Sequence, residues 1–66
     1  MNTKEYIQDM IKRYGSAQLT KKQAAYELQV SEMKIDRMRK SGELKSSKVG
    51  SQIRIAASVI AEFMVV

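Results

Sequence analysis

Cationic side chains are concentrated in the middle of this sequence, where they could bind a polyanion. Between residues 34 and 54 there are two acidic residues and seven basic ones, namely Lys34, Arg37, Arg39, Lys40, Lys45, Lys48 and Arg54. Ammonium groups bind phosphate oxygens as point charges, and an arginine fork can donate two hydrogen bonds to the edge of a guanine. A solvated position is the commoner explanation for any one of these residues. Seven cationic side chains close together repel one another, and binding a polyanion relieves that electrostatic repulsion.

The rest of the composition supports a polyanionic partner and argues against catalysis. The chain has 12 Lys and Arg against 7 Asp and Glu, a net charge of +5, and a pI near 9.8. Histidine and cysteine are absent, so the usual zinc site, a disulfide and the commonest catalytic bases and nucleophiles are absent too. There is no glycine-rich phosphate loop, and the serines have no evident activator. We therefore predict no enzyme, no cofactor, no metal and no small-molecule substrate.

A membrane surface is the competing polyanion. No apolar run approaches the roughly 18 residues needed to span a bilayer, and the first five residues are too polar for a signal peptide. We expect a cytoplasmic protein without a membrane partner.

Three glycine-containing breaks divide what we expect to be a single domain of 66 residues: Gly15-Ser16, Gly42 and Gly50-Ser51. Before the first break, apolar residues follow the stripe of an amphipathic leading helix over 3–14, which Asn2 or Thr3 can cap. That stripe consists of Tyr6, Ile7, Met10, Ile11 and Tyr14.

Two short helices joined by a tight turn are predicted next. Thr20 and Gln23 have the spacing of a capping box, which starts a helix that runs to about Leu28. Gln29 and Val30 form the turn, and Ser31 caps a second helix over 32–40, which carries Ile35 and Met38 inward. An ordinary helical hairpin has the same pattern.

After Gly42 the pattern changes to strands. Residues 44–49 and 52–56 flank Gly50-Ser51, a two-residue loop suited to a type II′ turn, and Ser58 can cap a last helix. We predict a mostly α fold, with three to four short helices and a two-stranded hairpin wing. The expected core is Leu19, Ala24, Leu28, Val30, Ile35, Met38, Leu44, Val49, Ile53, Ile55, Ile60 and Phe63.

Residues 19–64 resemble the excisionase-type, MerR-like winged helix-turn-helix family. The fragments that carry the resemblance are LTKKQAAYELQVS (19–31), IDRM (35–38), SGEL (41–44), VGS (49–51), IRI (53–55) and IAEF (60–63). The resemblance implies that the Ser31-capped helix enters the major groove of double-stranded DNA and that the hairpin approaches the backbone or minor groove.

The resemblance also implies a biological role. Excisionases, or recombination directionality factors, serve phages and other mobile genetic elements: they bind several adjacent sites, bend DNA and bias a tyrosine integrase toward excision. Other members are small transcription regulators, a repressor or activator of the same fold. The sequence does not separate these roles, and self-association on adjacent DNA sites is possible in either.

The expected DNA-binding residues are Lys21, Lys22, Met33, Lys34, Arg37, Lys40, Lys48, Ser51, Gln52 and Arg54. Arg37 is expected to read a base, with a phosphate contact as its alternative, whereas Lys34 and Lys40 are expected to bind phosphates. Lys21 and Lys22 begin a helix, where backbone amides also favour a phosphate. Arg54 could instead pair with Glu43 or Glu62.

Two features depart from the family pattern. Glu32 and Asp36 place acids on the recognition helix, where they weaken phosphate binding unless a cytosine amino group faces them. For Glu32, a favourable position at the helix N-terminus is the simpler explanation. The leading helix is the second departure, and it either covers the core or contacts another protomer.

RNA binding and protein binding are the remaining competitors. The one phenylalanine and three tyrosines do not form a stacking platform for single-stranded bases. A protein-interaction module would need an exposed apolar patch, for which Tyr6, Met10, Val65 and Val66 are the candidates.

Overall fold

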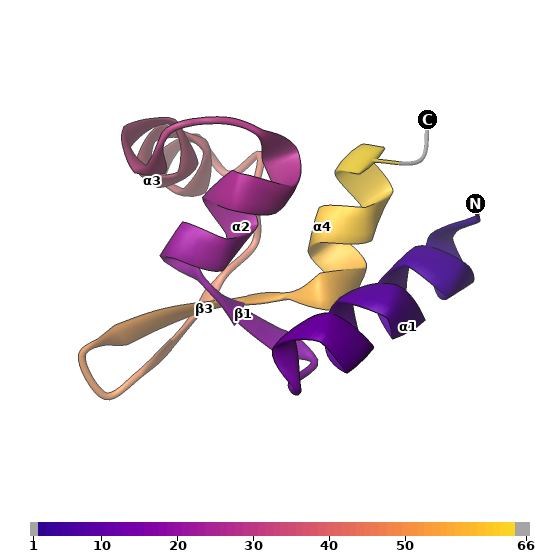
Figure 1. Ribbon diagram of the computed structural model, residues 1–66. Helices are drawn as coiled ribbons and strands as arrows, with labels where there is room; N and C mark the ends of the chain where they lie inside the picture. The colour runs from indigo at the N-terminus through magenta and orange to yellow at the C-terminus, as the bar shows by residue number, and fades with distance from the viewer. Residues whose placement is uncertain (1, 65–66) are drawn as a thin grey trace.

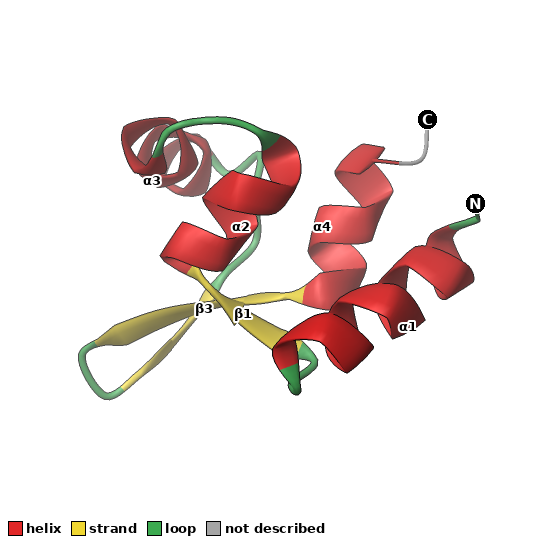
Figure 2. Ribbon diagram, in the orientation of Figure 1, coloured by secondary structure: helices red, strands yellow, loops and turns green. Residues whose placement is uncertain are grey.

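The computed structural model describes residues 2–64, which form four helices and three strands (Figures 1 and 2). Their order is α1 (Thr3–Tyr14), β1 (Gln18–Thr20), α2 (Lys21–Leu28), α3 (Glu32–Ser41), β2 (Ser47–Val49), β3 (Gln52–Ala56) and α4 (Ala57–Met64). The predicted winged helix-turn-helix architecture is confirmed. Helices α1 and α4 lie side by side, α2 and α3 form the helical pair, and the β2–β3 hairpin projects away from α1 and α4.

The predicted helix caps are present for the first three helices. The Asn2 side chain accepts a hydrogen bond from the Glu5 amide at 2.8 Å, and α1 ends at Gly15 with a φ of 72°. Thr20 and Gln23 form the expected capping box of α2, and the Ser31 hydroxyl accepts from the Lys34 amide at 3.1 Å. These local contacts satisfy backbone amides that helix geometry leaves free.

The wing forms as predicted between β2 and β3, and the structure adds a strand that we did not predict. The three strands are antiparallel in the order β1-β3-β2. Gly50 has a φ of 64° and Ser51 does not have a positive φ, which fits the type II′ turn and excludes type I′. The first wing strand begins at Ser47 rather than at Leu44, because Leu44 is buried and its amide donates to the Met38 carbonyl.

The last helix starts at Ala57, two residues before the start that a cap at Ser58 implies, so the prediction that Ser58 caps it was wrong. Strand β3 runs into α4 at Ala57 without a loop, and the Ala57 amide donates to the Ala17 carbonyl at 2.8 Å. Ser58 is therefore an exposed residue inside the first turn of α4.

The core draws side chains from all four helices, from β1 and β3, and from the segment before β2. The buried residues are Met10, Leu19, Ala24, Ala25, Ile35, Met38, Leu44, Ile55, Ala57, Ile60 and Ala61. Val49 and Phe63 were wrongly assigned to the core, since they are 65% and 39% exposed. Val49 pairs with the exposed Gln52 on the outer face of the sheet, and Ala57, Ile60 and Ala61 occupy the inner face of α4 in place of Phe63.

The leading helix covers the core. Met10 on α1 is fully buried, so it cannot belong to the exposed patch that a protein-binding module requires. Tyr6 is half-buried against the same cluster, and Val65 and Val66 lie outside the described residues.

A carboxylate at the end of α2 ties α1 to the helical pair. The guanidinium of Arg13 donates two hydrogen bonds of 2.8 Å to Glu27, whose side chain is 4% exposed, and the Tyr14 hydroxyl donates to the same carboxylate. The hydrogen bonds from Arg13 hold the pKa of Glu27 below its usual value. Burial, followed by the bond to Glu27, raises the pKa of Tyr14 to about 12. Glu27 is therefore a buried anion that needs Arg13 as its counterion.

Candidate nucleic-acid interface

The outer face of α3 carries a stripe of side chains that we predicted to bind DNA. Met33, Arg37 and Lys40 are spaced four and three residues apart, opposite the buried Ile35 and Met38. All three are exposed, and they line a shallow hollow of about 280 Å³ together with Asp36. Their position leaves them free to enter a groove of a duplex.

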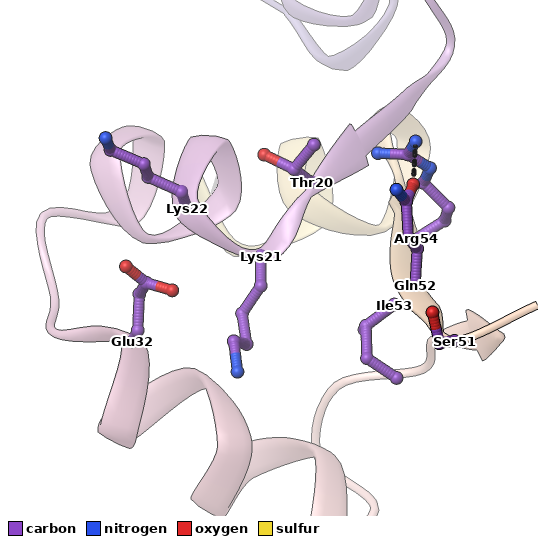
Figure 3. A pocket seen from close by; sticks show the side chains of 8 residues that line it. All are labelled: Thr20, Lys21, Lys22, Glu32, Ser51, Gln52, Ile53 and Arg54. Atoms are coloured by element: carbon purple, nitrogen blue, oxygen red, sulfur yellow. Dashed lines mark hydrogen bonds between the residues drawn. The ribbon is translucent and has the colours of Figure 1, made fainter. Parts of the chain in front are cut away.

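A second hollow, of about 440 Å³, connects α2, the start of α3 and the wing (Figure 3). Its lining contains five of the predicted DNA-binding residues: Lys21, Lys22, Ser51, Gln52 and Arg54. Thr20, Glu32 and Ile53 complete the lining. The fold thus brings together polar side chains that lie up to 34 residues apart in the sequence.

The register of the wing decides which of its side chains lie on the same face as Ile53, one of the residues that line this hollow. Lys48 is the direct cross-strand partner of Ile53, so both project from the same face of the sheet. In Figure 3 the Ile53 side chain points toward Lys21, which places Lys48 on the face directed toward α2 and α3. This is the arrangement that joint binding by the helix and the wing requires.

Arg54 and Gln52 project from the other face of the wing. The Arg54 guanidinium donates a hydrogen bond to the Gln52 side chain and is turned away from Lys21 (Figure 3). Within residues 2–64 it makes no ion pair with Glu43 or Glu62, the partners we had considered. Arg54 is therefore not grouped with the α3 stripe, although its side chain borders the hollow.

Lys34 is exposed on the flank of α3, off the line of Arg37.

Asp36 is neutralised by cations on two sides. Its carboxylate lies 3.1 Å from the Lys21 ammonium and 2.7 Å from the Arg39 guanidinium, and Arg39 also donates to the Ser46 hydroxyl at 3.1 Å. The bond from Lys21, and then that from Arg39, holds the pKa of Asp36 below its usual range. This chain of contacts links α2, α3 and the segment that leads into the wing.

The sequence did not reveal this network. We expected Lys21 to bind phosphate, but its ammonium is engaged by Asp36. Asp36 and Arg39 lie three residues apart on one helix, and that spacing was the only local sequence signal for any contact of this ion-pair network.

Glu32 differs from Asp36. It is exposed in the first turn of α3, and its carboxylate lies within 4.0 Å of no cation in the described part of the chain. Figure 3 shows it projecting from α3 toward α2, on the side of the hollow where Lys22 lies.

Residues 2–64 contain no cluster of three or more His, Cys, Asp and Glu side chains placed to hold a metal ion. None of the helices in this range has the length and apolar character that a membrane crossing requires.

The chain matches a known protein family. A family model described as "Helix-turn-helix domain" matches residues 19–64, from β1 to the end of α4. No curated protein and no solved structure matches the chain. The model covers more than half of the sequence and includes α2, the turn, α3 and the wing, while α1 lies outside it. This chain belongs to the helix-turn-helix domain family.

Proposed function

We propose that this protein binds double-stranded DNA in a sequence-specific manner, with α3 in the major groove and the β2–β3 wing against the backbone or minor groove. The observation that carries the proposal is the common orientation of two sets of side chains. Met33, Arg37 and Lys40 project outward from α3, and Lys48 projects from the face of the wing that is directed toward α3. A helix of this kind fits the major groove of B-DNA.

Each side chain has a distinct role in this proposal. Arg37 reads a guanine edge through its guanidinium fork, and the exposed thioether of Met33 contacts an apolar group such as a thymine methyl. Phosphates are bound by Lys22, Lys34, Lys40 and Lys48. Ser51 and Gln52 at the wing tip donate to the backbone, and Arg54 supports Gln52 through their hydrogen bond. Lys21 acts indirectly by holding Asp36.

The wing contact is tested by Lys48→Ala. We expect this variant to bind target and random duplexes more weakly by the same factor, because a phosphate contact carries no sequence information. The slope of log affinity against log salt should become about 1 unit less steep. The matched control is Lys4→Ala, which removes the same charge from the exposed start of α1, away from the wing. Fluorescence-anisotropy titrations measure both affinities. If the two substitutions weakened DNA binding equally, that result would contradict a wing contact.

The biological role that we propose is that of an excisionase, which bends DNA at several adjacent sites, self-associates there and biases a tyrosine integrase toward excision. The support is the resemblance of the motifs in residues 19–64. This role needs no catalysis by the chain. A neighbouring reading frame that encodes an integrase would add support.

The decisive test is a recombination assay with such an integrase. We expect the protein to raise the ratio of excision to integration and to bend the DNA in a circular-permutation assay. An unchanged ratio, together with tight binding near a divergent promoter, would favour a small transcription regulator instead.

A further inference from the structure

We propose that Glu32 is a specificity-determining residue that accepts a hydrogen bond from the exocyclic amino group of a cytosine in the major groove. The inference deepens the proposed function and rests on it. The cations of the hollow between α3 and the wing attract DNA, but the carboxylate of Glu32 places a negative charge there, at the N-terminal end of the recognition helix. That charge selects among bases.

The position of Glu32 is suited to base contact. It is the first residue of α3, and the N-terminal residues of a recognition helix are those that reach base edges. Its side chain is exposed and lines the 440 Å³ hollow with Ser51 and Gln52 of the wing. A duplex that contacts both α3 and the wing therefore passes beside this carboxylate.

The contrast with Asp36 shows why Glu32 matters. Both acids lie on α3 close to the proposed DNA surface, but Asp36 is neutralised by Lys21 and Arg39. Glu32 lies within 4.0 Å of no cation among residues 2–64, so no ion pair of the described residues neutralises its charge. An unpaired carboxylate weakens binding to any phosphate backbone. A base that donates a hydrogen bond to the carboxylate offsets its repulsion from the phosphates. A base without a donor at that position does not.

The chemistry of the bases identifies the partner. In the major groove, guanine presents two acceptors and thymine presents an acceptor and a methyl group, so both disfavour a carboxylate. Adenine presents a donor beside an acceptor. Cytosine presents only the N4 donor, and it is the base whose edge carboxylates accept from. The chemistry of the base edges therefore favours cytosine.

A simpler role for Glu32 is to stabilise the helix N-terminus through its charge, as acids in a first turn do. That role would lower the thermal stability of a glutamine variant but leave the sequence preference unchanged. The two roles are therefore separable by experiment.

The test is selection of binding sites from a randomised duplex library by the wild-type protein and by Glu32→Gln. We expect the DNA sites selected by the wild-type protein to contain a cytosine that is absent from the sites selected by Glu32→Gln. The reason is that glutamine presents both a hydrogen-bond donor and an acceptor. Changing that cytosine should weaken wild-type binding about 5-fold or more and the variant far less. The variant should also bind random duplexes more tightly than wild type. The control is Glu62→Gln, which makes the same charge change on the exposed face of α4.

The outcomes separate the inference from the proposed function. If both proteins select the same sequence, Glu32 does not read a base, while sequence-specific binding stands. If the wild type selects no sequence, both proposals are overturned. Glu62→Gln and Glu32→Gln could also raise the affinity for random DNA by the same factor. That result would show an effect of net charge alone and would contradict a local role for Glu32.

Discussion

Substitution of Arg13 by methionine is expected to lower the free energy of unfolding by about 2–3 kcal/mol at neutral pH. Among residues 2–64, it leaves the carboxylate of Glu27 buried with only the Tyr14 hydroxyl as a hydrogen-bond partner. Removing one partner of a fully buried pair costs about 3–5 kcal/mol, and the lower figure reflects the 41% exposure of the Arg13 side chain. A chain of this length is stabilised by only about 3–10 kcal/mol in total. Urea denaturation followed by circular dichroism measures the loss.

The dependence of this loss on pH identifies its cause. Because the pKa of Glu27 is lowered in the folded protein, its stabilisation is fully present above the ordinary value near 4.5. It disappears as the pH falls through the lowered value. We therefore expect the difference between wild type and Arg13→Met to be large at pH 7 and to shrink toward pH 3. Lys12→Met, an exposed neighbour on α1, should show little loss at either pH. A loss that does not vary with pH would assign the effect of Arg13 to packing alone.

Substitution of Arg37 by alanine is expected to narrow the difference in affinity between target and random DNA by about 1–3 kcal/mol, or roughly 5- to 150-fold. The reason is that a guanidinium fork discriminates guanine through two hydrogen bonds, whereas a phosphate contact strengthens binding to every sequence equally. Competition titrations with target and random duplexes measure the difference. Arg37 is exposed, and no described acid forms an ion pair with it, so its removal leaves no charge uncompensated in the protein.

Lys40→Ala is the matched control, because Lys40 lies three residues along the same stripe of α3. We expect it to weaken target and random binding by the same factor. If Arg37→Ala also lowered both affinities equally, Arg37 would be a ligand of the backbone, and base reading would have to come from other residues of α3.

Local sequence signals predicted most of the helices and the turn of the wing. Capping residues act within three positions of the amides that they bind, so Asn2, Thr20 and Ser31 could be identified from spacing alone. Gly50 could be assigned to the hairpin turn for the same reason, because the need for a positive φ is a property of one residue.

Features that depend on contacts distant in sequence were missed. Strand β1 has only three residues, too few to show an alternating pattern, and it exists because Leu19 pairs with Ile55. The ion pairs of Lys21 with Asp36 and of Arg13 with Glu27 span 15 and 14 residues and depend on how helices cross. Glu27 had no sequence signal of burial, since an isolated glutamate in a helix is usually exposed.

The arrangement of the predicted DNA-binding residues could be foreseen only in part, for the same reason. The stripe on α3 follows from helical periodicity, so Met33, Arg37 and Lys40 could be placed on one face from sequence. The wing depends on register, and a shift of one residue exchanges its two faces. The observed register places Lys48 on the face of the sheet that carries Ile53 and Arg54 on the opposite face, which composition alone could not distinguish.

The most direct measurement of DNA binding by α3 and the wing together is the salt dependence of the affinity of the wild-type protein for a labelled duplex. Each phosphate neutralised contributes about −0.9 to the slope of log affinity against log salt. Lys22, Lys34, Lys40 and Lys48 together predict a slope of about −3 to −4. A slope near zero, or no detectable binding to duplex DNA at low salt, would contradict the account.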